Sequence, residues 1–170
     1  MSIKEELEAL SDDVSNLEKI YAKYRSRKSL LTKLVLLVSH EEPKIQSRAT
    51  WLLKRFAQDK AQFKASQLNA LFDSLAGVAH WESKLHLCQM LPYVRVPRGS
   101  ETKVAWFLER NLLDENKFLR AWAYSGLYEL ARQHPKYREY AIEQLDRAKS
   151  EKSAAVKARI RKVRKAMNLP

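Results

Sequence analysis

The sequence predicts an all-α fold, specifically a right-handed α-solenoid of about four antiparallel helix pairs with an extra N-terminal helical segment. Three observations lead to this prediction. The chain of 170 residues holds only three glycines and five prolines, so helix breakers and turn residues are scarce. Apolar residues recur at spacings of three and four, the period of an amphipathic helix. A short pattern also returns every 36 or 37 residues, which is typical of stacked helical repeats.

Residues 1–27 are predicted to form the N-terminal helical segment, which caps the solenoid or packs on it. Ser2 and Glu5 fit the capping box that begins a helix. The run Ser11-Asp12-Asp13 could begin a second helix, so one helix or two are expected. The apolar positions repeat by three and four: Leu7, Leu10, Val14, Leu17, Tyr21 and Tyr24. We predict that this seam packs on the body of the protein; the alternative is a homodimer through the N-terminal helix as a coiled coil.

Residues 28–170 are predicted to form one repeat domain, and the whole chain a single structural domain. The four units are expected at about 28–65, 66–99, 100–136 and 137–170, each with two helices. The eight helices are expected at 29–39, 43–57, 66–76, 79–91, 101–113, 115–133, 137–149 and 151–167. Pro97 and Gly99 mark the clearest loop, at 94–100.

The second helix of each predicted pair carries a basic residue followed by a small or apolar one. These basic residues are Arg48, Lys84, Arg120 and Lys157. The signature resembles that of HEAT-like and armadillo-type helical repeats over roughly residues 28–168. The resemblance implies helix pairs that stack to bury a shared core, with the second helices along a concave side where partners bind. An irregular helical bundle is the alternative fold.

The net charge of +12 is concentrated in two zones. Residues 28–65 hold eight basic and three acidic groups, and residues 137–170 hold ten and four. A field of this sign attracts nucleic acid, acidic proteins or anionic lipid. The sequence has a single cysteine, Cys88. It has no apolar leader and no apolar run near the ~20 residues of a membrane span. We therefore predict a cytoplasmic protein without a transmembrane segment.

The C-terminal helix has the sharpest charge pattern. At about 100° per residue, one narrow stripe is apolar, made by Val156, Ile160, Val163 and Met167. The rest of the circumference is basic: Lys157, Arg159, Arg161, Lys162, Arg164 and Lys165. We expect the apolar stripe to pack on the preceding helices and the basic face to be free for phosphates or other anions. A solvated terminal cap is the alternative interpretation.

The second helices supply most of the predicted partner-binding residues. The full set is Trp51, Lys54, Arg55, Lys84, Arg120, Trp122, Lys157, Arg161, Arg164 and Lys165. Basic residues at the recurrent position can instead bond to a neighbouring turn of the repeat, and both roles stay open. Trp51 with Arg55, and Trp106 with Arg110, are four residues apart and could form cation–π pairs.

Enzyme signatures are absent from the sequence. It contains no Gly-rich phosphate loop and no G-x-S-x-G, H-E-x-x-H or C-x-x-C motif. His80, His86 and Cys88 do not share one helical face, so no metal site is predicted, and no cofactor. HEAT-like DNA alkylpurine glycosylases are a distant architectural resemblance, and they use tryptophans and an aspartate on inner helices. This chain has the tryptophans, but its predicted second helices contain no aspartate.

These patterns predict a non-catalytic interaction module that binds an anionic partner. An acidic protein is the leading expectation, because protein binding is the commoner use of such architectures. A nucleic acid is the alternative, and a membrane surface ranks last because the C-terminal helix lacks Trp or Phe anchors. Basic groups interleaved with aromatic groups would favour nucleic acid, whereas an exposed apolar patch would favour a protein.

Overall fold

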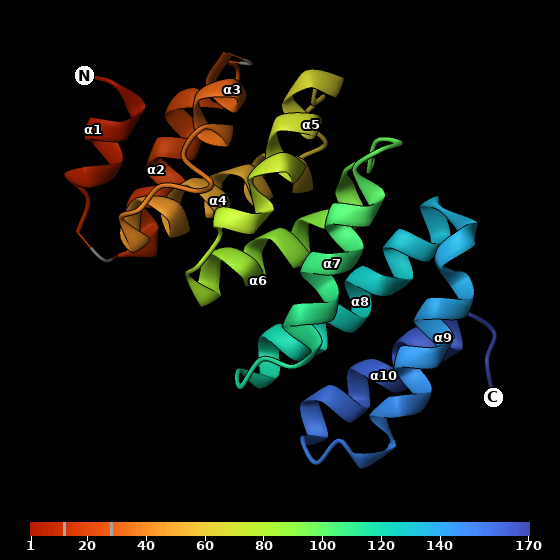
Figure 1. The fold of residues 1–170 in the computed structure, drawn as a ribbon. Coiled ribbons are helices and arrows are strands. Elements are labelled where there is room, and N and C mark those ends of the chain that lie inside the picture. Colours follow the sequence, from red (N-terminus) through yellow and green to blue (C-terminus); the bar gives the residue numbers. More distant parts are fainter. Residues whose placement is uncertain (12, 28) are drawn as a thin grey trace.

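The computed structural model describes residues 1–11, 13–27 and 29–170, and this part of the chain is all-α, without strands. The helices are α1 (Ile3–Glu8), α2 (Val14–Tyr24), α3 (Ser29–Val35), α4 (Pro43–Gln58), α5 (Ala65–Asp73), α6 (Trp81–Met90), α7 (Glu101–Leu112), α8 (Lys117–Gln133), α9 (Arg138–Arg147) and α10 (Ala154–Ala166). They follow one another through the molecule in chain order, so the two termini lie at opposite ends (Figure 1).

Each of the eight helices expected after residue 28 corresponds to one of α3 to α10, with ends that differ by a few residues. Several predicted helices end as tighter 3₁₀ turns. These turns cover Ser74–Gly77, Leu91–Tyr93 and Ala148–Ser150. Pro92 explains one of them, because proline lacks the amide hydrogen that would continue the α-helical bonding.

The N-terminal segment contains two helices rather than one. The capping box at α1 is confirmed: Ser2 N donates to the Glu5 carboxylate at 2.6 Å, and Glu5 N donates to Ser2 Oγ at 3.3 Å. Asp13 caps α2 by accepting from Ser15 N at 2.8 Å. Asp12, the middle residue of the predicted restart, and Lys28, the predicted domain boundary, lie outside the described residues.

The predicted N-terminal seam packs on the body of the protein. Both α1 and α2 contact α4. Leu7 is fully buried, and Leu17, Tyr21 and Tyr24 are also buried. Val14 differs from the prediction, because it is 58% exposed at the start of α2. Four of the six seam positions therefore contribute to the intramolecular core.

The core of the described chain runs along α4, α6, α8 and α10. α4 packs on α6, α6 on α8 and α8 on α10, while α3 contacts α5 and α5 contacts α7. Buried apolar residues from Ile3 to Met167 form one connected cluster. Close packing at α8 requires Gly126, where an added Cβ would lie 2.4 Å from a Leu108 methyl carbon.

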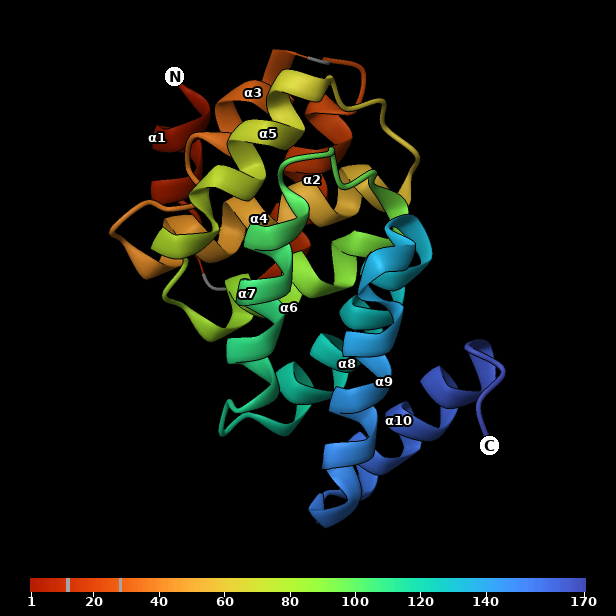
Figure 2. The same ribbon diagram turned by 45° about the vertical axis from the view of Figure 1, so that its right-hand side comes forward.

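The last helix, α10, lies beyond α8 and α9 at the end of the molecule opposite to the N-terminus, as Figure 2 shows. Its predicted apolar stripe is confirmed as buried: Val156, Ile160, Val163 and Met167 are all 9% exposed or less. No further helix of the described chain covers its other side. Its position explains why one half of its circumference remains in solvent.

Candidate interaction surface

The recurrent cations have different surroundings in the four second helices. Arg48, on α4, is buried, and its guanidinium donates to Leu7 O at 2.6 Å and to Leu10 O at 3.0 Å. These carbonyls lie at the end of α1 and just after it, where helix carbonyls lack intrahelical partners. Arg48 therefore attaches the N-terminal segment to α4, so it has a structural role.

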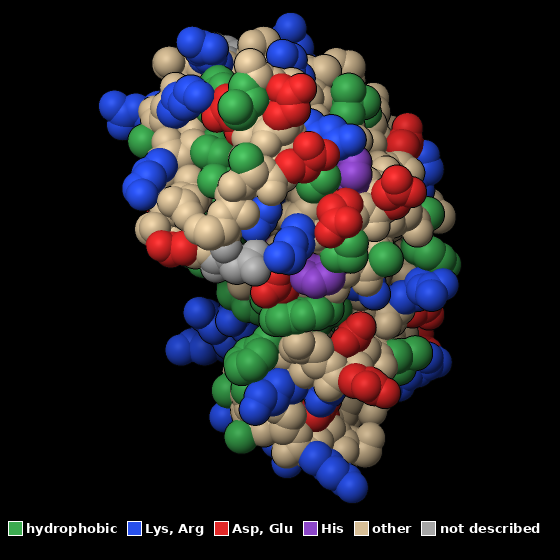
Figure 3. Space-filling view, turned by 90° about the vertical axis from the view of Figure 1, so that its left-hand side faces the viewer, with side chains coloured by type: hydrophobic (Ala, Val, Ile, Leu, Met, Phe, Trp, Pro, Cys, Tyr) green, Lys and Arg blue, Asp and Glu red, His purple; other side chains and the backbone are tan. Residues whose placement is uncertain are grey.

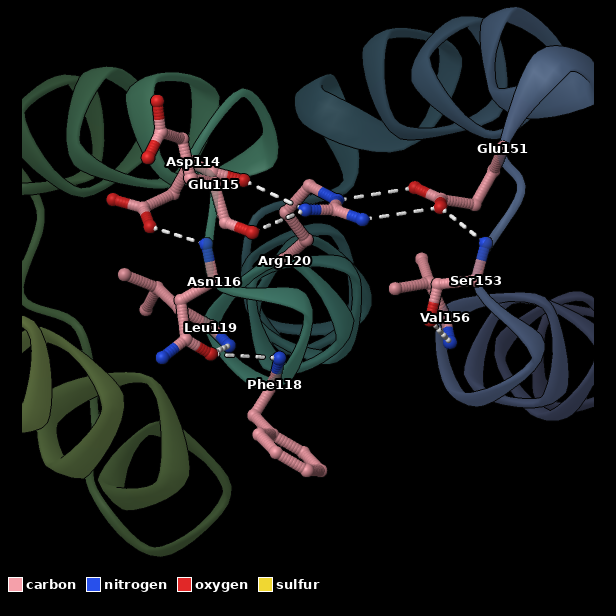
Figure 4. A network of polar contacts seen from close by, with 9 residues as sticks. All are labelled: Asp114, Glu115, Asn116, Phe118, Leu119, Arg120, Glu151, Ser153 and Val156. Atoms are coloured by element: carbon pink, nitrogen blue, oxygen red, sulfur yellow. Dashed lines mark hydrogen bonds and ion pairs between the residues drawn. The ribbon is translucent and has the colours of Figure 1, made fainter.

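Arg120, on α8, also has a structural role, as Figure 4 shows. Its Nε and Nη2 donate to the two carboxylate oxygens of Glu151, each at 3.1 Å. Its Nη1 donates to Asp114 O at 2.8 Å and to Glu115 O at 3.0 Å. Glu151 in turn accepts from Ser153 N at 2.8 Å, and the Arg120 hydrogen bonds are the main cause that lowers the pKa of this carboxyl. The planar guanidinium thus connects the segments before α8 and α10.

Lys84 and Lys157 complete the set of recurrent positions. Lys84, on α6, is half-buried, with its ammonium 4.0 Å from the Asp114 carboxylate. Lys157, on α10, is exposed, and its ammonium makes no hydrogen bond or ion pair with the residues that the structure describes. Three of the four recurrent cations therefore have intramolecular partners, and the last one is open to solvent.

A second set of side chains forms what we call the second-helix face. Each second helix contributes two residues three apart: Trp51 and Lys54, His86 and Gln89, Trp122 and Ser125, and Arg159 and Lys162. Contacts cross between neighbouring helices: Lys54 Nζ lies 3.3 Å from Gln89 Oε1, and the Arg159 guanidinium lies 4.1 Å from the centre of the Trp122 ring. These contacts join the α4 part of the face to its α6 part, and the α8 part to the α10 part.

Arg159 and Lys162 were predicted on the basic face of the C-terminal helix but were left out of the set of partner-binding residues, although they contribute to the second-helix face. Arg159 covers Trp122 from the neighbouring helix and is half-buried, whereas Lys162 is exposed. The signal was present in the sequence, because Arg159 and Lys162 occupy α10 at the spacing that Trp122 and Ser125 have on α8. A search along the repeat period would have found them.

One predicted cation–π pair is wrong and one is confirmed. The Arg55 guanidinium lies 4.8 Å from the centre of the Tyr21 ring, not over Trp51, and it also pairs with Asp59 at 2.5 Å and Glu18 at 3.5 Å. The partner is different because α2 packs against α4 and offers Arg55 the Tyr21 ring and the Glu18 carboxylate, while Asp59 follows α4 itself. Arg55 is therefore separated from the second-helix face.

The Trp51 ring instead lies 5.9 Å from the Lys54 ammonium, whereas the pair of Trp106 and Arg110 forms as predicted, at 4.8 Å. Of the four tryptophans, Trp81 and Trp106 are exposed. The two that were predicted to bind a partner, Trp51 and Trp122, are half-buried. Each has a cation close to its ring. Because both rings are only half-buried, part of each indole remains accessible on the second-helix face.

The exposed side of α10 is strongly basic. Its six cations are accompanied by no acidic residue within the helix. Arg164 donates to Asp146 at 2.8 Å, and it is the one α10 cation with a carboxylate partner in the described chain. The predicted binding residues Arg161 and Lys165 are exposed, as is Lys157. The end of the molecule that carries α1 and α2 differs, because Lys and Arg side chains alternate there with Asp and Glu (Figure 3).

The second-helix face also contains groups with shifted pKa values. Burial lowers the pKa of Lys54. Burial, together with the charge of Lys54, lowers the pKa of His86 to about 3, so this imidazole is neutral near pH 7. His86 Nδ1 lies 3.1 Å from Thr50 Oγ1. The neutral imidazole of His86 and the partly desolvated ammonium of Lys54 make this part of the face polar. The two groups do not form an acid–base pair with a carboxylate of the described chain.

Within the described ranges, no group of three or more His, Cys, Asp or Glu side chains is arranged to hold a metal ion. Cys88 is fully buried and unpaired, which raises the pKa of its thiol well above the usual range. Across the same residues, no helix combines the length and the apolar character that crossing a bilayer requires. The candidate site is therefore a surface formed by charge, rings and amides.

Comparison with known proteins leaves these surfaces as the main guide to function. No protein-family model, no curated protein and no solved structure matches the chain.

Proposed function

We propose that the chain is a non-catalytic interaction module with a HEAT-like, right-handed α-solenoid fold of four antiparallel helix pairs, and that it binds an anionic macromolecule. The recurrent spacing of Arg48, Lys84, Arg120 and Lys157 supports the repeat interpretation. The successive packing of α4, α6, α8 and α10 is what a solenoid would produce.

The exposed basic side of α10 is the single observation that carries the binding proposal. Cations that serve the fold have partners in this protein, as Arg48 and Arg120 do. Lys157, Arg161 and Lys165 have no carboxylate partner in the described chain and extend into solvent. With Arg159 and Lys162, five of the six α10 cations lack a carboxylate partner in the described chain, and their field attracts an anionic surface and strengthens at low salt.

An acidic protein is the partner that we propose first. Stacked helical repeats offer an extended, rigid surface, and such surfaces commonly bind proteins. In the proposed complex, carboxylates of the partner would contact Lys157, Arg161 and Lys165. The second-helix face would supply the half-buried rings of Trp51 and Trp122. Electrostatic attraction would set the rate of association, and the ring contacts would hold the complex.

Nucleic acid is a second candidate, and one observation favours it. Arg159 lies over Trp122 and Lys162 is three residues further along the same helix, so cations and a ring alternate at this end of the second-helix face. Single-stranded nucleic acids bind to such surfaces through stacked bases and paired phosphates. By contrast, the apolar seam of the N-terminal segment is largely buried, so it offers a protein partner little surface.

The test is fluorescence-polarisation binding of four labelled probes across a salt series: a poly-glutamate peptide, single-stranded DNA, duplex DNA and structured RNA. A triple variant with Lys157→Gln, Arg161→Gln and Lys165→Gln should weaken the preferred probe about tenfold or more and flatten its salt dependence. A control triple variant with Arg25→Gln, Lys33→Gln and Arg95→Gln removes the same charge elsewhere and should retain most of the affinity.

Preference for the peptide would support an acidic protein, and preference for a nucleic acid would replace it by the second candidate. If no probe binds at physiological salt, or if both triple variants weaken binding equally, the proposed role of α10 is wrong.

A further inference from the structure

The second-helix face is hollowed at its N-terminal end. A cavity of about 580 Å³ lies between α2, α4 and α6, within the size range of pockets that hold small molecules. Leu17 of α2 and Leu85 of α6 contribute apolar walls, and Trp51 contributes a half-buried ring. Lys54 and Gln89 line the same cavity. It therefore combines a planar apolar wall with a cation.

Lys54 is unusual among the cations of this protein. Lys54 and Lys84 are the two half-buried lysines of the described chain, and Lys84 has a carboxylate, that of Asp114, at 4.0 Å. Within the described residues Lys54 has none; its ammonium meets the Gln89 amide oxygen at 3.3 Å and the Trp51 ring at 5.9 Å. An ammonium that is partly removed from water without a counter-charge is destabilised, which agrees with its lowered pKa.

Among the described residues, no carboxylate forms an ion pair with Lys54. His86 lines the cavity as a neutral ring. Two described carboxylates line the cavity but bond elsewhere: Glu82 accepts from Ser47 Oγ at 2.8 Å, and Asp13 accepts from Ser15 N at 2.8 Å. Gln89 uses its carbonyl oxygen on Lys54, so its NH₂ is the amide group left to donate. An entering anion would thus find one ammonium and one amide donor beside an indole wall.

We infer that this cavity is a binding site for a small aromatic oxyanion, in which a carboxylate or phosphate pairs with Lys54 and the ring it carries packs on Trp51. The ligand supplies the counter-charge that the described residues do not offer Lys54, so binding stabilises the charged form of Lys54. The ring is required because Trp51, Leu17 and Leu85 form apolar walls that a bare inorganic anion would leave unfilled. This site is separate from α10 and does not depend on the proposed macromolecular partner.

The experiment titrates the full chain with benzoate, phenyl phosphate and inorganic phosphate, and follows the indole N–H signal of Trp51 by NMR. A Trp51→Phe variant assigns the signal. Benzoate or phenyl phosphate should shift it with saturation, and the pKa of the Lys54 amine should rise in the complex. The preferred aromatic probe distinguishes a carboxylate ligand from a phosphate ligand. Inorganic phosphate should bind at least about tenfold more weakly.

Two substitutions at Lys54 make the test specific. Lys54→Met keeps the apolar stem and should weaken the aromatic probe about tenfold, whereas Lys54→Arg keeps the charge and should retain binding within about threefold. Lys33→Met, at an exposed lysine on α3, serves as the matched control. Thermal unfolding verifies that each variant is folded.

Failure of this inference is distinguishable from failure of the proposed function. The triple α10 variant should bind the aromatic probe as the wild type does. The inference is overturned if neither aromatic probe shifts the Trp51 signal at millimolar concentration, or if Lys54→Met and Lys33→Met bind equally well. It is also overturned if inorganic phosphate binds as tightly as phenyl phosphate, because the ring would then contribute nothing.

Discussion

Arg120 of α8 and Lys157 of α10 occupy the same position of the repeat pattern, but their surroundings differ. α8 has helices on both sides, and Arg120 bonds to Glu151 on one side and to the carbonyls of Asp114 and Glu115 on the other. α10 is the last helix, so no following segment of the described chain offers Lys157 a carbonyl or a carboxylate. A similar residue is therefore a structural link in one helix and an exposed charge in the other.

The difference follows from where each helix lies: α8 has packed segments on both sides that can bond its recurrent cation, and α10 has them on one side. Within the stack, a cation at the recurrent position binds the segment that begins or ends a neighbouring helix, as Arg48 and Arg120 do. At the end of the stack the same pattern persists without its partner. The exposed side of α10 is strongly basic, and we propose that it binds an anionic partner.

The largest expected effect is the loss of the Arg120 network. Arg120→Met should lower the free energy of unfolding by about 3 kcal/mol, because it removes four hydrogen bonds and leaves Glu151 half-buried without its cation. Lys157→Met is the matched control and should change it by less than about 0.5 kcal/mol. Denaturant unfolding of both variants measures the difference. Equal losses would show that the two positions are equivalent after all.

A smaller effect is expected at the acidic partner of Arg120. Glu151→Gln should lower the free energy of unfolding at neutral pH by about 1.5 kcal/mol, because a charge-assisted pair becomes a neutral one. Arg120 lowers the pKa of Glu151 below the ordinary value of 4.5 in the folded state. Its stabilising contribution is therefore complete above pH 4.5 and is lost as the pH falls through the lower, folded pKa.

The difference in stability between wild type and Glu151→Gln should consequently narrow on acidification below pH 4.5, as measured by denaturant unfolding across a pH series. Glu143→Gln, at an exposed carboxylate on α9, is the control and should leave the acid dependence close to that of the wild type. A gap of constant size would mean that Arg120 does not influence the ionisation of Glu151.

The smallest effect concerns packing on the two helices. Gly126→Ala on α8 should destabilise the protein by about 1 kcal/mol, because the added methyl group meets Leu108 and only part of the strain is offset by better helix propensity. Ala158→Met, on the exposed side of α10, adds more atoms and should cost less than about 0.5 kcal/mol. Thermal unfolding is sufficient to rank them. A larger loss at residue 158 would mean that the outer side of α10 is not free.

The sequence predicted the eight helices of residues 28–170 and the buried stripe of α10, because helix formation and amphipathic faces follow from residues three and four apart. It also predicted that the N-terminal seam packs on the body. It left open whether that segment is one helix or two, since its restart signal is a single polar run. It placed the positive charge of the C-terminal helix correctly because no acid interrupts it.

Only the tertiary structure decided which side chains those faces meet. Arg55 lies over Tyr21 instead of Trp51, Arg159 covers Trp122, and Lys84 has a carboxylate partner whereas Lys54 has none among the described residues. The partners in these pairs are 30 or more residues apart in sequence, and no local pattern encodes how the elements that carry them are rotated relative to one another. Local periodicity determines which face of a helix is apolar. The packing of one helix on another decides whether a cation on the remaining faces is neutralised or left for a ligand.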